Sequence, residues 1–322
     1  MHIPDGFLDS KTAVATGVLA ATGLSVALRQ ARVHLPPRRV PLLGLAAAFV
    51  FAAQMINFPV AGGTSGHLVG GVLAAVLLGP SPAVVVVSAV LIVQCLMFAD
   101  GGLSALGANI LNMGVLGAVG GWAIYFAVSR VVKGLFGCVL AAAFAAWCST
   151  VLGSIACAGE LAVSRTVGWT VVLPAMAGIH MFIGVGEGFI TALVLVAIAR
   201  ARPELLPPHA PVESRRSYGA VLIYGGLIAL GLALFASPFA SSWPDGLDRT
   251  AEALGFREKT ANPLLPAPLP DYRMPGMHWS VLSTSLAGGV GTIVVFVLAW
   301  LLARVLVPKA NRIEEAGPPR SP

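Results

Sequence analysis

Charged residues are scarce in this chain. Only 11% of the 322 residues are Asp, Glu, Lys or Arg, whereas 57% are hydrophobic. A soluble domain carries about 25% charged residues. The composition therefore excludes a soluble globular protein and predicts a polytopic membrane protein, whose length reflects its number of membrane spans. The net charge of +6 is then explained by basic residues on the cytoplasmic side of the membrane, and we expect no nucleic-acid partner.

Several motifs are also missing. There is no G-x-x-x-x-G-K-[ST] sequence, so any ATP hydrolysis must occur in a partner. No basic segment precedes the first apolar stretch, where Asp5 and Asp9 lie instead, so we do not expect a cleaved signal peptide. No pair of cysteines has the C-x-x-C spacing of a zinc site or redox pair, which favours a role as small core residues for Cys95, Cys138, Cys148 and Cys157.

Apolar segments dominate what remains. We expect nine, at 12–28, 41–57, 67–79, 82–98, 107–128, 135–158, 171–199, 217–237 and 279–307. The third is short for a full crossing and meets the turn signal Gly79-Pro80, so we expect a tilted or partial helix there. The predicted fold is an all-α polytopic membrane protein with a seven-segment helical core and a two-helix C-terminal hairpin.

The segments divide the chain into three parts. Residues 1–199 form the core, and 200–216, rich in Pro, Arg and His, are expected to be a cytoplasmic linker. Residues 217–322 form a two-span domain with an outer loop at 238–278. That loop contains the sequence Trp-Pro-Asp-Gly-Leu-Asp from position 243, followed by a short amphipathic helix pattern.

The distribution of basic residues predicts the orientation. If the N-terminus lies outside and the C-terminus in the cytoplasm, most of the 20 Lys and Arg residues lie inside, as the positive-inside rule requires. The exceptions on the outside would be Lys11, Arg165, Arg249, Arg257, Lys259 and Arg273.

The Met1-His2 start offers three nitrogens within one dipeptide: the α-amine, the His2 backbone amide and the His2 imidazole. A metal bound by all three closes a five-membered and a six-membered ring. One further nitrogen completes a square plane, which suits Ni(II) or Cu(II). The bulky His2 should also prevent removal of Met1. The alternative interpretation is that the Met-His start is coincidental.

A glycine-rich loop on the same side, residues 61–67, ends in His67. His67 is placed to supply the fourth nitrogen. The alternative is a simple helix-capping loop in which Thr64 or Ser65 caps the third segment. Other polar residues near membrane depth are candidates for hydrogen bonds that orient the ligands, or for contacts that merely hold helices together. They are Asp5, Ser65, Gln94, Asn109, His180 and Glu187.

Together these residues resemble a known family. The segments Met1–Phe7, Gly62–His67 and Gly184–Gly188 look like the CbiM/NikM family, the substrate-binding membrane subunits of energy-coupling-factor transporters for cobalt and nickel. The likeness covers about residues 1–200. The tail, with Pro244-Asp245-Gly246-Leu247, resembles the small accessory (NikN-like) component of the same systems.

The resemblance implies a function and a set of partners. Met1, His2 and His67 would bind Ni(II) or Co(II) as the transported substrate, with no organic cofactor. The partners would be a transmembrane coupling subunit of the EcfT/CbiQ/NikQ type and two ABC ATPase subunits, in the lipid bilayer of the bacterial inner (cytoplasmic) membrane. Because the tail has no histidine except His278, we expect it to tune loading or release and not to form the primary metal site.

Two other functions compete. Gly63-Thr64-Ser65-Gly66 matches the G-x-S-G pattern of rhomboid intramembrane proteases, with Ser65 as nucleophile and His180 as base. That interpretation gives the Met-His start and His67 no role. A proton-coupled metal permease is the third possibility, but its usual H-x4-D-H signature is absent.

Overall fold

The computed structural model describes residues 1–206 and 218–306, and most of them are helical. The prediction of an all-α polytopic protein is confirmed. Among the described residues, seven helical stretches are long and apolar enough to cross a membrane. The helices are α1 (Ser10–His34), α2 (Val40–Gln54), α3 (Gly71–Leu78), α4 (Pro80–Phe98), α5 (Leu106–Asn109), α6 (Gly121–Val131), α7 (Gly134–Val163), α8 (Trp169–Ala201), α9 (Gly219–Gly231), α10 (Gly246–Leu254) and α11 (Ser280–Leu306).

The two remaining apolar segments are shorter helices, α2 and α3. α3 has only eight residues and is followed by Gly79, whose φ of 95° turns the chain into α4. Glycine tolerates this left-handed φ, and Pro80 suits the first turn of a helix. The short third segment expected from the sequence is therefore present. A π-helical stretch, Ile110–Gly120, joins α5 to α6 as one continuous span.

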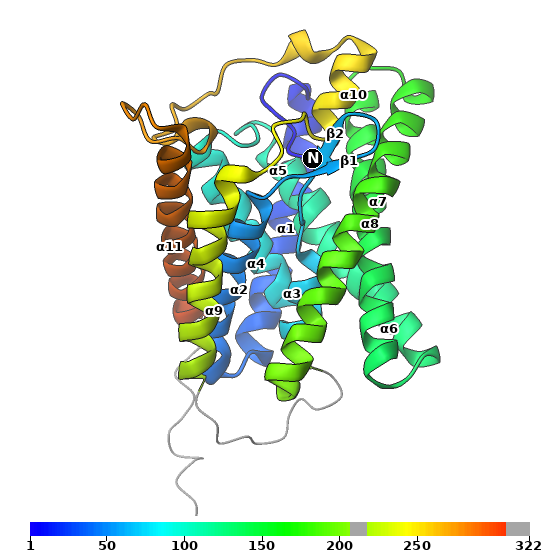
Figure 1. The fold of residues 1–322 in the computed structure, drawn as a ribbon. Helices are drawn as coiled ribbons and strands as arrows, with labels where there is room; N and C mark the ends of the chain where they lie inside the picture. Colours follow the sequence, from blue (N-terminus) through cyan, green and yellow to red (C-terminus); the bar gives the residue numbers. More distant parts are fainter. Residues whose placement is uncertain (207–217, 307–322) are drawn as a thin grey trace, which may run out of the picture.

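The helices stand side by side in one bundle (Figure 1). α7 and α8 form a closely packed pair, whereas α11 runs along α2, with α9 also against α2. Gly291 on α11 allows this approach, because a Cβ there would lie 2.3 Å from the Phe51 ring on α2. The two-helix C-terminal hairpin thus packs on the side of the core formed by α2. Most of the proposed linker, 207–216, lies outside the described residues.

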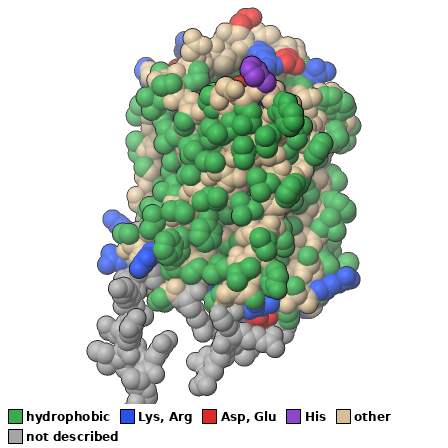
Figure 2. All heavy atoms as spheres, turned by 60° about the vertical axis from the view of Figure 1, so that its left-hand side comes forward, with side chains coloured by type: hydrophobic (Ala, Val, Ile, Leu, Met, Phe, Trp, Pro, Cys, Tyr) green, Lys and Arg blue, Asp and Glu red, His purple; other side chains and the backbone are tan. Residues whose placement is uncertain are grey.

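The surface of the bundle carries a broad apolar band. Hydrophobic side chains cover the middle of the face shown in Figure 2, while Lys and Arg gather at its two ends. Large apolar side chains on α7, α8, α9 and α11 are exposed, including Phe144, Phe189, Tyr224 and Ile293. Exposed apolar area on this scale matches hydrocarbon tails and not water.

The N-terminus and the tail loop meet at the same end of the bundle (Figure 1). A two-stranded antiparallel hairpin, β1 (Phe58–Val60) and β2 (Thr64–Gly66), lies between them. The chain after β2 runs through His67 to α3. The strand before His67 is fixed at one residue by the bridge between Ser65 and Asp245, which precedes α10.

Candidate metal site

The first residues of the chain are threaded into the bundle. Met1 is 6% exposed and Ile3 is fully buried. The backbone N–H of Ile3 donates to Asn109 Oδ1 over 2.8 Å, and Asn109 Nδ2 donates back to the Ile3 carbonyl. Asp5 Oδ1 accepts from the Ser104 backbone N–H and hydroxyl at 2.8 and 2.6 Å. Two of the candidate polar residues, Asn109 and Asp5, therefore anchor the N-terminal segment.

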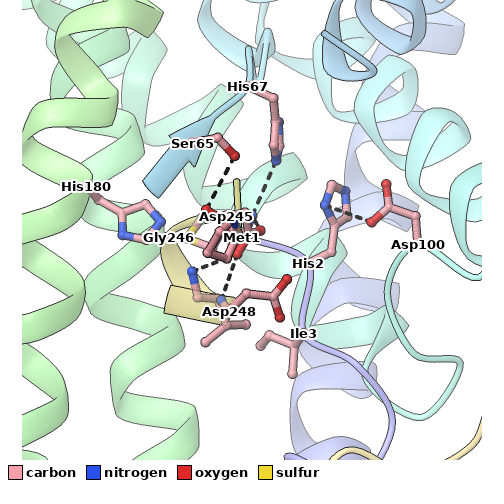
Figure 3. A network of polar contacts seen from close by, with 12 residues as sticks. Met1, His2, Ile3, Ser65, His67, Asp100, His180, Asp245, Gly246 and Asp248 are labelled. Atoms are coloured by element: carbon pink, nitrogen blue, oxygen red, sulfur yellow. Dashed lines mark hydrogen bonds and ion pairs between the residues drawn. The ribbon is translucent and has the colours of Figure 1, made fainter. Parts of the chain in front are cut away.

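These anchors bring Met1, His2 and His67 together (Figure 3). The α-amine of Met1 lies 3.3 Å from His67 Nε2. The His2 and His67 rings are stacked, with centroids 5.2 Å apart. Nitrogens about 2.0 Å from a metal on adjacent corners of a square plane are about 2.8 Å apart. The amine and His67 thus need to move by only about half an ångström to share one ion.

The His2 ring is held by two other side chains. Its Nδ1 lies 3.3 Å from Asp100 Oδ1, and its Nε2 lies 3.2 Å from Gln94 Oε1. Asp100 in turn accepts a 2.5 Å hydrogen bond from the Tyr272 hydroxyl. Chelation through the amine and Nδ1 of His2 requires the ring to turn from Asp100 toward Met1. Gln94 is the candidate polar residue that touches a proposed ligand directly.

A carboxylate from the tail also reaches the amine. Asp245 Oδ2 lies 2.6 Å from the Met1 nitrogen. Asp245 is not among the site residues predicted from the sequence. The available signal was an Asp in a loop on the same side as Met1, directly before an amphipathic helix pattern. That position predicts the N-cap of α10 but not its contact with the amine.

Ser65 holds the tail in this place. Its backbone N–H donates to the Pro244 carbonyl over 2.8 Å, and its hydroxyl donates to the Trp243 carbonyl over 2.7 Å. His180 lies on the other side of the tail, with its Nδ1 2.7 Å from the Met176 carbonyl. The Ser65 hydroxyl is thus committed to a carbonyl and not to His180, which gives the protease interpretation no support.

Glu187 lies away from the three nitrogens. Its carboxylate accepts the backbone N–H groups of Val69 and Gly70 at 2.6 and 3.0 Å. The Gly70 amide belongs to the N-cap residue of α3 and the Val69 amide to the residue before it, so Glu187 caps the start of that helix from α8. His180 and Glu187 share a helix face but bind different partners.

A cavity of about 480 Å³ opens beside the site. His2 and His67 line it, and so do residues of the tail loop. The charged residues that line the cavity are mostly acidic. They are one arginine, Arg257, and five carboxylates, Asp100, Asp245, Asp248, Glu252 and Asp271. Such an excess of negative charge raises the local concentration of cations.

The electrostatics distinguish the amine from the imidazoles. Burial is the largest single effect and disfavours the Met1 ammonium, but the charge of Asp245 and its hydrogen bond to the amine, together with the charge of Asp100, raise the pKa of the amine overall. Burial and the nearby Met1 charge lower the pKa of His67 to about 3. Burial also lowers the pKa of His2, although Asp100 opposes this. Near neutral pH both imidazoles therefore offer lone pairs, whereas the amine must first lose a proton.

Side chains alone do not make this a metal centre. Within residues 1–206 and 218–306, no three His, Cys, Asp or Glu side chains are grouped so as to hold a metal ion. A metal site here needs backbone nitrogens in addition to side chains, and the Met1 amine and the His2 amide can supply them. Ligation by Met1, His2 and His67 stays a prediction, and the three residues lie close enough together for it.

Comparison with known proteins decides the family. The model of the cobalt uptake substrate-specific transmembrane region, CbiM, matches residues 2–205, and the PDGLE domain matches residues 219–308. The chain belongs to the CbiM family. In this CbiM-family chain the core is fused to a PDGLE tail, as the sequence resemblance had indicated.

Relatives with the same fusion exist. The putative fused nickel transport protein NikMN of Archaeoglobus fulgidus is 37% identical over 308 residues, covering 94% of this chain and 98% of that protein. The fused nickel transport protein NikMN of Rhodobacter capsulatus is 34% identical, covering 84% and 88%. A crystal structure of a truncated transition metal transporter is 31% identical, with a TM-score of 0.57, over 62% of this chain and 99% of that one.

Proposed function

We propose that this CbiM-family chain is the substrate-specific membrane component of an ATP-driven energy-coupling-factor system that takes up nickel or cobalt. It binds M(II) through the Met1 amine and nitrogens of His2 and His67. A transmembrane coupling subunit and two ABC ATPases supply the energy. The chain lies in the cytoplasmic membrane with its N-terminus outside.

One observation carries the metal-binding part of this proposal. The buried Met1 amine lies 3.3 Å from His67 Nε2, beside the stacked His2 ring and next to an acidic cavity. A buried amine and two neutral imidazoles form a nitrogen-rich set that suits tetragonal Ni(II) better than hard, oxygen-seeking cations. The fused relatives named above are called nickel transport proteins, so nickel is the first metal to test.

The experiment extends the chain by a short tag before Met1. An extension converts the amine into an amide and displaces a buried residue, so Ni(II) binding and uptake should be lost. The same tag placed after Pro322 is the matched control, and mass spectrometry of the untagged protein establishes that Met1 is its first residue. Normal binding and uptake by the N-terminally extended protein would show that the amine is not a ligand.

A further inference from the structure

The tail loop contacts the Met1 amine through Asp245, and the proposed function assigns no role to this contact. Asp245 Oδ2 lies 2.6 Å from the Met1 nitrogen, while Asp245 Oδ1 accepts the backbone N–H groups of Leu247 and Asp248, each at 2.8 Å. One oxygen caps α10 and the other faces the amine. The carboxylate is thus fixed from both sides.

Packing against the core determines where this carboxylate sits. Ser65 pairs with the Pro244 carbonyl, and Gly246 lies against His180 and Ile183 on α8. A Cβ on Gly246 would lie 2.7 Å from His180 Cε1 and 2.9 Å from Ile183 Cδ1. A glycine at this position therefore lets the start of α10 approach the core closely enough for Asp245 to reach Met1 (Figure 3).

We propose that the fused tail supplies Asp245 as the positioning carboxylate that orients the Met1 amine toward the metal ion and offsets the charge of the ion. The inference rests on the proposed function, because it assigns a partner to a nitrogen of that same site.

The chemistry of an amine ligand supports this assignment. A metal-bound primary amine uses its lone pair but keeps two N–H groups, and one of them can go on donating to Asp245. Carboxylates that accept from a ligand in this way fix its orientation and increase its basicity. Met1 and His67 are buried, and a cation held among buried groups requires a compensating charge nearby. Asp245 is the carboxylate bonded to the amine itself.

The opposite role is also physically possible and makes a different prediction. Asp245 could compete with the metal for the amine, so that loading releases the tail. In that case removal of the carboxylate would tighten binding and metal would loosen the segment around α10. The two roles are distinguished by whether removal of the carboxylate weakens or strengthens metal binding.

The test measures Ni(II) affinity of the full chain in detergent by calorimetry. Asp245→Asn keeps the shape and an N-cap acceptor, since Asn caps helices as well as Asp does, but removes the charge. We expect about 10- to 100-fold weaker binding, the usual effect of losing an outer partner of a ligand. Asp9→Asn is the matched control, because Asp9 is also an N-cap carboxylate, accepting the Thr12 backbone N–H at the start of α1, but it is exposed and does not line the cavity. Its affinity should stay close to wild type.

Two further readouts distinguish positioning from general destabilisation. At saturating Ni(II), the visible ligand-field band should shift in Asp245→Asn and not in Asp9→Asn. In the unmutated chain, hydrogen exchange of the peptide covering 244–250 should stay equally slow or become slower when Ni(II) is added. This last measurement needs no variant, so misfolding of Asp245→Asn does not prevent a result.

Failure of the inference and failure of the proposed function give different results. If His67→Ala binds Ni(II) like wild type, the proposed site is wrong. If His67→Ala loses binding but Asp245→Asn binds as tightly as wild type or more tightly, only the role of Asp245 is overturned. Faster exchange of residues 244–250 on metal addition would likewise overturn it and indicate a displaceable competitor.

Discussion

Individual residues near Met1 hold the dipeptide at which we propose that the metal binds. The Met-His start supplies nitrogens but no rigidity, and Asn109, Gln94 and Asp245 provide the hydrogen bonds that hold them. Preorganisation of this kind reduces the ordering cost of binding.

His2→Ala and His67→Ala should each lower the affinity for Ni(II) by more than about 100-fold, beyond the 10- to 100-fold typical of an outer partner. Each change removes one nitrogen from a small set. His34→Ala is the control, because His34 is exposed at the end of α1 and its Nδ1 contacts the Gln30 carbonyl. Calorimetry in detergent checks this, and equal affinity of all three variants would contradict it.

Metal affinity should rise with pH between about 6.5 and 8. The Met1 ammonium has a raised pKa and must lose a proton to bind, whereas His67, with a pKa of about 3, is already neutral. If the His2 amide also ligates, binding releases about two protons per ion. Calorimetry in two buffers of different ionisation enthalpy counts these protons. Zero release would exclude the amine as a ligand.

Helices and loops were predictable to different degrees. The long spans follow from apolar runs: the expected segments 135–158 and 171–199 correspond to α7 and α8. The short third helix was signalled by Gly79-Pro80. The pairing of Ser65 with the segment just before α10 was not, because a backbone hydrogen bond between residues 179 positions apart leaves no local pattern. Propensity and periodicity report on neighbours in sequence and not on such contacts.

Glu187 offers a test at the level of one helix. Glu187→Ala should leave the amides of Val69 and Gly70 without their acceptor, at about 1–3 kcal/mol for each buried group. The free energy of unfolding should fall, and Ni(II) affinity should fall with it, because these amides lie just after His67. Glu187→Gln retains one acceptor oxygen and should be less affected. Thermal unfolding of both variants at the wild-type temperature would contradict the capping role.

The whole molecule shows two ends of different character. The end with Met1 carries the acidic cavity, and the opposite end carries the C-terminal turns of α1, α6, α8 and α11, whose basic residues include Arg32, Arg130, Arg200 and Arg304. Positive residues at that end agree with a cytoplasmic location.

In the proposed function, the energy for uptake comes from partner subunits. The chain has no P-loop sequence, so rapid uptake should require the coupling subunit and the ATPases. Vesicles that contain all components and internal ATP should accumulate Ni(II), and vesicles with this chain alone should show only slow passage. Full-rate uptake by the chain alone under a proton gradient would contradict the proposed mechanism.

The contact between Met1 and Asp245 joins residues 244 positions apart, so the ribosome makes Met1 long before it makes Asp245. At about 5–20 residues per second, the ribosome makes Asp245 about 12–50 seconds after Met1. With Asp245 acting as proposed, tight metal capture begins only after translation has passed the outer loop. Fusion of the tail thus delays tight capture until Asp245 has been made, because a chain that ended before this residue would retain its nitrogens and bind the metal more weakly.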